Sequence, residues 1–337
     1  MDSLTQIVLG GAVGEAVLGK KVGNKAVLWG AIGGTIPDLD TIPGQFMDTV
    51  DRLAIHRGFS HSIIFAILMA PLLGYLVNRL YKGKGANFRD WTSLFFWAIF
   101  THPLLDIFTT WGTQLFWPLD WRIALHSIFV IDPLYTVPFL LCLLVVLFLA
   151  RKNKLRRKVN RWGLYISSLY LLWTLIAKLI VNEKIENILK EDGVEWQSYQ
   201  SRPGIFNTIL WSFNIEQNDR FLITYYSFLD KDEELLIHEF HKNHHLLNPY
   251  RNHKDIEKLI FLTKGYFIIE EVEDGLLMHD LRFGLTEGFS ENKGDFVFTY
   301  KIIEEEGELL IEQEEQSFKG MEDVLERNYL RMMGKKI

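Results

Sequence analysis

Residues 55–62 read Ile55-His56-Arg57-Gly58-Phe59-Ser60-His61-Ser62, and a long apolar run begins directly after them. Two more polar clusters accompany this stretch: Pro37-Asp38-Leu39-Asp40 lies upstream, and His102-Pro103-Leu104-Leu105-Asp106 lies downstream. Each cluster stands where an apolar segment begins or ends. Imidazoles and carboxylates at such positions are costly to keep without a partner. The sequence therefore predicts that the three clusters converge on one metal site at a membrane face.

The distribution of hydrophobic residues decides the fold class. Hydrophobic residues make up 48% of the 337 residues and charged residues 23%, which alone fits a soluble or a membrane protein. Residues 1–181 carry long apolar runs, whereas residues 182–337 mix acidic, aromatic and β-branched residues. We expect a polytopic α-helical membrane domain over 1–181 and an extracytoplasmic β-rich α+β soluble domain over 182–337.

The membrane domain is expected to contain six helical segments, at 4–18, 26–36, 62–80, 91–111, 133–150 and 162–181. The first two are shorter than the roughly 20 residues that span a bilayer upright. They would form either a hairpin that reaches part-way or two short spans packed inside the bundle. The segment 38–60 is expected to be a polar loop.

Lysine and arginine alternate between the connecting loops. Three of them lie in the loop 19–25, four in 79–91 and seven in 151–161. The loops between these hold fewer, two in 38–60 and one in 112–131. By the positive-inside rule the three richer loops are cytoplasmic. Both termini and all the candidate ligands would then lie on the outer side.

Charge and cysteine content exclude several classes. The net charge of −6 gives no support for nucleic-acid binding. The single cysteine, Cys142, excludes an internal disulfide and a cysteine-rich zinc module. Met1-Asp2-Ser3 lacks the basic leader of a cleavable signal peptide.

The second half shows β-branched and aromatic enrichment between turn residues. Strands are expected at 195–199, 209–216, 220–229, 235–240, 265–273, 276–283 and 296–304, and helices at 255–263 and 320–333. Glu273-Asp274-Gly275 is expected to form a hairpin turn, because Asp-Gly tolerates positive φ.

The residue types in the three clusters indicate a particular metal chemistry. His102 and Asp106 are four apart, so they share one face of a helix. Asp38 and Asp40 lie two apart after a proline, and in extended or turn backbone both can point at one centre. Carboxylate with imidazole suits Zn²⁺, Mn²⁺ or Fe²⁺. Such a metal lowers the pKa of bound water and supplies a nucleophile near neutral pH.

Structural interpretations stand beside the functional ones. His102 could be a buried histidine bonded to a backbone carbonyl, and Asp38 or Asp40 could cap a helix or form an Asx turn. Arg57 could anchor at the interface or hold a phosphate by two hydrogen bonds. Glu15, in an apolar segment, could be a ligand, a buried contact between helices or an acid at the outer mouth.

Other polar residues have simpler interpretations. Ser60 is expected to be the N-cap of the segment 62–80, and Asp132 the N-cap of 133–150. A second histidine group follows a strand and is expected to lie in a solvated loop: His238, His241, His244, His245 and His253.

The three clusters, together with the opening Asp2-Ser3-Leu4-Thr5-Gln6, resemble the YdjM-like family of predicted membrane-bound, metal-dependent hydrolases. The resemblance covers roughly residues 1–180. It implies a bacterial inner or plasma membrane protein with a divalent metal, and it carries over six candidate metal ligands: Asp38, Asp40, His56, His61, His102 and Asp106. One residue departs from the pattern, because many members have Thr-His where this chain has Thr5-Gln6.

The sequence thus predicts a metal-dependent hydrolase, with zinc preferred, at the outer membrane–water interface. A phosphoester lipid or an envelope metabolite is the expected substrate. Metal-activated water would attack phosphorus, Asp40 or Glu15 would take the proton, and Arg57 would steady the developing charge. The rival hypothesis is a non-enzymatic scaffold or transporter-like module with a structural His/Asp network. The sequence indicates no particular protein partner.

Overall fold

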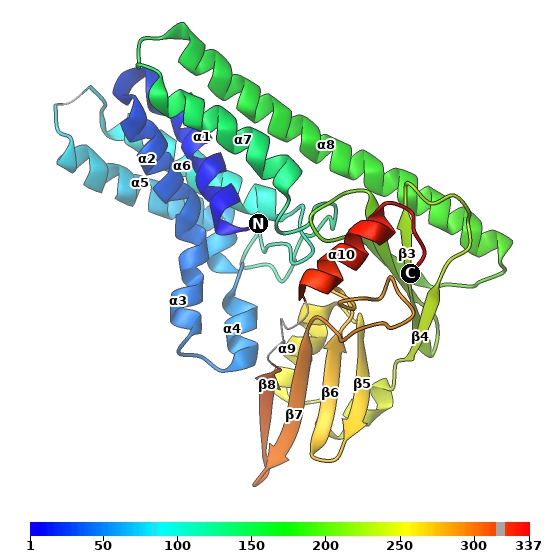
Figure 1. The fold of residues 1–337 in the computed structure, drawn as a ribbon. Helices are drawn as coiled ribbons and strands as arrows, with labels where there is room; N and C mark the ends of the chain where they lie inside the picture. The colour runs from blue at the N-terminus through cyan, green and yellow to red at the C-terminus, as the bar shows by residue number, and fades with distance from the viewer. Residues whose placement is uncertain (84, 315–320) are drawn as a thin grey trace. The chain divides into compact units, whose positions relative to one another are not determined.

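The computed structural model describes residues 1–83, 85–314 and 321–337, and it divides into two compact units. The first unit comprises Met1–Gln45 and Ile55–Leu175, and the second comprises Phe46–Ala54 and Ile176–Ile337. The first is helical and the second is rich in β-strands (Figure 1). The predicted order, a helical N-terminal region followed by a β-rich C-terminal domain, is confirmed.

The first unit contains the helices α1 Ser3–Val22, α2 Asn24–Thr35, α3 Thr41–Gly44, α5 Ile63–Leu80, α6 Phe88–Asp106, α7 Pro133–Phe148 and the first part of α8, Lys154–Glu191. Two 3-10 turns, η1 Ile36–Asp40 and η2 Phe59–His61, lie at the borders of the expected loop. They carry three of the candidate ligands predicted from the sequence. The loop itself is partly helical.

Side chains at the helix starts explain where three of these helices begin. Ser62 caps α5 by accepting from the backbone N–H of Phe65, and Asn87 forms a capping box with Asp90 at α6. Asp132 caps α7 as expected. The prediction that Ser60 caps the segment 62–80 is wrong, because the Ser60 hydroxyl binds Asp40 instead.

Glycines bring α1 and α2 into close contact. A Cβ on Gly30 would lie 2.3 Å from the carbonyl oxygen of Gly10, and a Cβ on Gly14 would lie 2.2 Å from that of Ala26. Only glycine permits this approach, which is the packing that small residues give membrane helices. As a result, the end of α2 lies beside the start of α1, where the candidate site is built.

Among the described residues, two helices are long and apolar enough to cross a membrane: Ile63–Leu80, and an 18-residue window within Lys154–Glu191. The helix Pro133–Phe148 is apolar but shorter. The helix α8 differs from expectation at both ends. It begins inside the basic stretch 151–161 and continues past residue 181, because its last turns bury apolar side chains in the second unit. The six-span arrangement remains a prediction.

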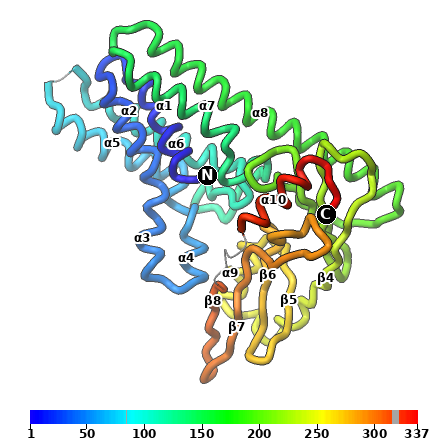
Figure 2. The backbone as a smooth tube through the Cα atoms, in the orientation of Figure 1, coloured from blue at the N-terminus to red at the C-terminus, as the bar shows by residue number. Residues whose placement is uncertain are grey.

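The second unit holds two four-stranded antiparallel sheets. Figure 2 traces the backbone of the chain through them. The first has the order β1 Ser198–Pro203, β2 Leu210–Glu216, β3 Arg220–Ser227 and β4 Ile237–His241; the second has β5 Phe267–Val272, β6 Gly275–Asp280, β7 Thr299–Glu305 and β8 Glu308–Gln313. The remaining elements are α4 Thr49–Ile55, η3 His244–Tyr250, α9 Lys254–Thr263 and α10 Met321–Met332. Gly320, where the last predicted helix was to begin, lies outside the described residues.

Core packing and turn chemistry account for this unit. Apolar side chains of β2, β3 and β5 and the loop after β6 share one cluster, which includes Phe221, Ile268 and Leu281. The expected Asp-Gly hairpin is present, since Val272 pairs with Gly275. The strand β8 was missed because its short apolar run, Leu309-Leu310-Ile311, is flanked by acids on both sides. Its turn places Glu306 and Gly307 at positive φ, as a tight hairpin requires.

Candidate metal centre

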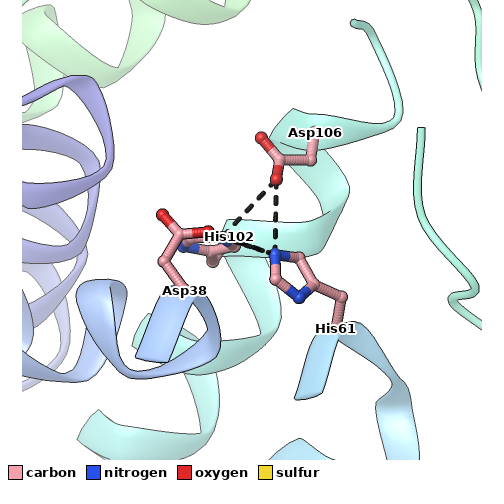
Figure 3. A group of neighbouring side chains, drawn as sticks. All are labelled: Asp38, His61, His102 and Asp106. Carbon is pink, nitrogen blue, oxygen red and sulfur yellow. Dashed lines mark hydrogen bonds and ion pairs between the residues drawn. The ribbon is translucent and has the colours of Figure 1, made fainter. Parts of the chain in front are cut away.

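Four side chains from three segments of the first unit point toward one another (Figure 3). Asp38 comes from η1, His61 from η2, and His102 and Asp106 from the last turns of α6. One nitrogen or oxygen from each lies within 4.8 Å of the others. All but Asp38 are fully buried.

The distances between these atoms suit a single metal ion. The Nε2 atoms of His61 and His102 are 3.1 Å apart. Asp38 Oδ1 lies 3.4 Å and 3.3 Å from these two nitrogens, and Asp106 Oδ2 lies 3.5 Å from each. Bonds of ~2.0–2.1 Å to a tetrahedral Zn²⁺ place its ligand atoms about 3.3 Å apart. The four atoms therefore surround a space of metal size.

Hydrogen bonds at the far side of each ring set the orientation of both imidazoles. His102 Nδ1 lies 2.5 Å from the carbonyl oxygen of Gly34, which can only accept, so this nitrogen carries a proton. His61 Nδ1 lies 2.9 Å from the Ser60 hydroxyl, which itself donates to Asp40. In the neutral rings both Nε2 lone pairs then face the centre. Metal-binding histidines are oriented in this way by their outer partners.

The two carboxylate oxygens of Asp106 differ in their hydrogen bonding. Its Oδ1 accepts from the N-terminal amino group of Met1 and, at 3.0 Å, from Gln6 Nε2. Its Oδ2 is buried and accepts no hydrogen bond within the described part of the chain, although Arg57 Nε lies 3.4 Å away. A buried acceptor without a hydrogen bond is costly. The residues present therefore fit a cation at the centre.

The charges of the cluster favour a positive charge between its members. Burial lowers the pKa of the His61 imidazole, but contacts with Asp106, Asp38 and Asp40 outweigh it and raise that pKa to about 9. Burial also raises the pKa of Asp38, yet hydrogen bonds with His102 and His61 hold it well below its usual range. Without a metal, a proton on His61 supplies this positive charge. A divalent cation would supply a larger positive charge while both imidazoles stay neutral.

Asp40 lies behind His61 and connects it to His56. Its Oδ2 accepts from Ser60 Oγ at 2.6 Å and from the backbone N–H of Arg57 at 3.0 Å, and its Oδ1 lies 2.9 Å from His56 Nδ1. Burial raises the pKa of Asp40, but the contacts with His56 and His61 keep it well below its usual range. Asp40 is thus an ionised, fully bonded carboxylate that positions two imidazoles.

The opening of the site lies at Asp38 and His56. Their side chains are 25% and 29% exposed, whereas those of His61, His102 and Asp106 are 0% exposed. The His56 ring packs beside Trp111, and its centroid is 6.0 Å from that of His61. A molecule that reaches the cluster from solvent therefore meets these two side chains first.

Comparison with known proteins assigns the helical region to a family. The model of the YdjM inner membrane protein family matches residues 1–181, more than half of the chain. The chain belongs to the YdjM inner membrane protein family. The resemblance predicted from the sequence is thereby confirmed.

Two curated proteins are similar to parts of the chain. The chain is 34% identical over 105 residues to the inner membrane protein YbcI of Escherichia coli strain K12, covering 31% of this chain. It is 26% identical over 204 residues to the uncharacterized protein YfhP of Bacillus subtilis strain 168, covering 57% of this chain. Each match spans 59% of the relative's own length. No solved structure matches the chain.

The structure of this YdjM family member separates the predicted ligands into two groups. It brings Asp38, His61, His102 and Asp106 together and places Asp40 and His56 beside them. The prediction that Asp40 and His56 are ligands therefore requires correction. In the 3-10 turn, with three residues per turn, the side chains of Asp38 and Asp40 point about 120° apart, so Asp38 faces Nε2 of His61 whereas Asp40 faces its Nδ1.

The predicted catalytic residues also separate. Arg57 is buried at the site, with Nη1 donating to Thr109 Oγ1 at 2.9 Å. Glu15 lies elsewhere, because both of its carboxylate oxygens bind the buried guanidinium of Arg156. Along α1 it stands nine residues from Gln6, roughly 13 Å at 1.5 Å per residue. The prediction that Glu15 takes a proton in the site is wrong, because it is a helix–helix contact.

Gln6 is a site residue that the sequence analysis named only as a departure from the family pattern. Its side-chain amide donates to Asp106 Oδ1 and, at 3.3 Å, to the carbonyl oxygen of His102. Gln6 thus connects α1 to the C-terminal end of α6. Gln6 therefore faces the cluster and contacts its Asp106 carboxylate.

Proposed function

We propose that this protein is a metal-dependent hydrolase of the inner membrane. The observation that carries the proposal is the meeting of two imidazoles, whose Nε2 atoms face the centre, and two carboxylates, with five of the distances between them at 3.1 to 3.5 Å: His61, His102, Asp38 and Asp106. These four residues would hold the ion. Zn²⁺ suits the donor set best, and Mn²⁺ or Fe²⁺ also suit it. When bound, such an ion acts as a Lewis acid and lowers the pKa of water.

His56 is the residue that would accept a proton during hydrolysis. It lies at the opening, and its Nδ1 faces the ionised Asp40 at 2.9 Å. This contact holds the proton on Nδ1 and leaves Nε2 as the basic nitrogen, as in other oriented imidazole–carboxylate pairs. His56 takes over the role that the sequence gave to Asp40 or Glu15. Asp40 acts through His56 and His61 as a positioning residue.

Arg57 keeps a positive charge beside the cluster. Its guanidinium is buried between Asp106 and Thr109, and its φ of 61° turns the backbone so that the N–H reaches Asp40. Negative charge grows on phosphoryl oxygens as a phosphoester is cleaved, and a preorganised cation lowers that cost. We therefore propose a phosphoester substrate, carried by a lipid or an envelope metabolite.

The proposed location is the outer membrane–water interface, with the chain multi-pass and residues 182–337 extracytoplasmic. Gln6 contacts the cluster, and Lys20 and Lys21 end the same helix, roughly 22 Å further along at 1.5 Å per residue. The ligands and the basic turn thus lie at opposite ends of α1. The positive-inside rule would then place the ligands outside.

One observation favours the rival hypothesis of a structural network. Asp106 already faces the Met1 amino group and Arg57, and a protonated His61 would neutralise the remaining carboxylates. Under that hypothesis the cluster binds a proton and no metal. Metal content therefore separates the two hypotheses.

Metal analysis tests the centre directly. The full chain, purified in detergent with a tag that contains no histidine, is expected to hold close to one equivalent of metal. The variants His61→Ala, His102→Ala and Asp106→Ala are expected to lose most of it, whereas the exposed His245→Ala keeps the wild-type content. Equal metal in all of these proteins would remove the proposal.

An unbiased screen with phosphomonoesters, phosphodiesters and lipid phosphoesters would then test the reaction. Activity that follows metal content, and that is lost on chelation and restored by added Zn²⁺ or Mn²⁺, is expected. A metal-loaded protein that hydrolyses none of these classes would support a transporter-like or structural role.

A further inference from the structure

A second polar site lies at the other end of the helical unit, where two turns meet. One is the α1–α2 turn around Gly23, and the other is the α7–α8 turn, which contains Arg151. Asn24 Nδ2 donates to the carbonyl oxygen of Leu147 at 2.9 Å, and Arg151 Nη1 donates to that of Lys21 at 2.6 Å. Gly23 has φ 63°, and its Cα faces the Arg151 side chain. The turns are therefore held together by their own contacts.

A cavity of about 500 Å³ lies between these turns. Its walls include Lys25, Arg151 and Arg156, together with Asn24 and the apolar end of α7. Arg156 is already bound to Glu15, to Asn24 Oδ1 at 2.6 Å and to two carbonyls of α7. It forms the floor of the cavity. Lys25, whose Nζ lies 4.4 Å from the centre of the Tyr81 ring, and Arg151 are exposed, and within the described residues neither forms an ion pair with a carboxylate.

The surrounding charge is strongly one-sided. The segments 19–25 and 151–161 hold ten lysines and arginines and no acid. Two carboxylates contact these segments and both are already paired, since Glu15 binds Arg156 and Asp90 binds Lys21 at 2.7 Å. An anion that enters the cavity would therefore meet uncompensated positive charge.

An apolar surface adjoins the cations. Phe148 lines the cavity and is 89% exposed, and Leu144 lies one turn before it on the same face of α7. On α2, Leu28 is likewise exposed one turn beyond Lys25. A small inorganic anion would make no apolar contacts with this surface, whereas the acyl chain of a lipid would cover it.

We propose that this cavity binds the phosphate group of an anionic phospholipid, with the acyl chains lying along Phe148 and Leu144. Basic pockets between membrane helices have the charge and depth to take lipid headgroups. The site is separate from the metal centre, and the proposal does not depend on hydrolase activity. Its ligand chemistry is a phosphate ester that carries one net negative charge.

Native mass spectrometry of the full chain in detergent tests the proposal. With phosphatidylglycerol we expect one tightly bound lipid, held at least tenfold more strongly than phosphatidylcholine. The double variant Lys25→Gln/Arg151→Gln removes two cations and is expected to weaken phosphatidylglycerol binding by about 30-fold, at roughly fivefold for each charge. The matched control Lys152→Gln/Lys158→Gln removes the same amount of charge from the basic segment 151–161, at residues that do not line the cavity, and is expected to change binding by less than twofold.

Two further experiments distinguish a lipid from a soluble phosphate as the ligand, and a third controls for misfolding. Phe148→Ser is expected to weaken the lipid at least fivefold, and millimolar inorganic phosphate or glycerol 3-phosphate is expected to leave it bound. Displacement by either soluble phosphate at equal concentration, or equal loss in both double variants, would overturn the proposal. Unchanged thermal unfolding of Lys25→Gln/Arg151→Gln shows that the fold persists, and the single variant Lys25→Gln replaces it if unfolding shifts.

Discussion

The substitution Asp40→Asn examines the proposed proton transfer most sharply. The asparagine side chain has the shape of aspartate, but only one of its two terminal atoms can accept a hydrogen bond. Its oxygen must stay at the Oδ2 position, which faces the backbone N–H of Arg57 at 3.0 Å and Ser60 Oγ at 2.6 Å. Its NH₂ group then faces His56 Nδ1, where Asp40 Oδ1 lies at 2.9 Å.

This arrangement reverses the tautomer of His56. The Nδ1 atom must now accept, so the proton moves to Nε2 and the imidazole can no longer take a proton there. General base catalysis contributes about 10²- to 10⁴-fold, and we expect kcat to fall by that factor. His61 loses part of its outer support, which lowers metal affinity by about 10- to 100-fold. Activity is therefore measured at saturating metal.

The assay compares kcat, KM and metal content of Asp40→Asn with those of Asp120→Asn, the same change at an exposed carboxylate of the same unit. The ¹⁵N chemical shifts of His56 report its tautomer without a substrate. A fully metal-loaded Asp40→Asn enzyme with kcat within twofold of wild type would falsify the proposed role of His56.

The remaining predictions concern the frame of the site. Glu15→Ala leaves the Arg156 guanidinium buried without its carboxylate, so we expect the free energy of unfolding, measured with heat or denaturant, to fall by about 3–5 kcal/mol. Replacing both residues with methionine is expected to recover most of this loss. Gly30→Ala places a Cβ against the carbonyl oxygen of Gly10, so we expect the free energy of unfolding to fall by about 1–3 kcal/mol and the metal content to fall as well. A wild-type metal content in this variant would show that the site does not depend on the close packing of α1 and α2. Lys152→Cys in a cysteine-free background is expected to react with an impermeant maleimide only in inside-out vesicles; labelling in intact spheroplasts would reverse the proposed topology.

The order of the two halves of the chain and part of the site follow from local patterns in the sequence. Hydrophobic runs separated the helical half from the β-rich half, because burial in lipid and burial in a sheet demand different patterns. The four-residue spacing of His102 and Asp106 placed both on one face of α6, because that spacing is nearly one helical turn. These features depend on residues that are close in the chain.

Tertiary structure decided which of the remaining polar residues meet. His56 and His61 look equivalent in the sequence, but the turn at Arg57 and Gly58 sends one ring to Asp40 and the other to the centre. Asp38 and Asp40 likewise diverge because the backbone after Pro37 forms a 3-10 turn. Glu15 required a partner, and only the packing of α8 on α1 supplied Arg156 from 141 residues away. Contacts between distant segments depend on packing and backbone direction, which local spacing does not encode.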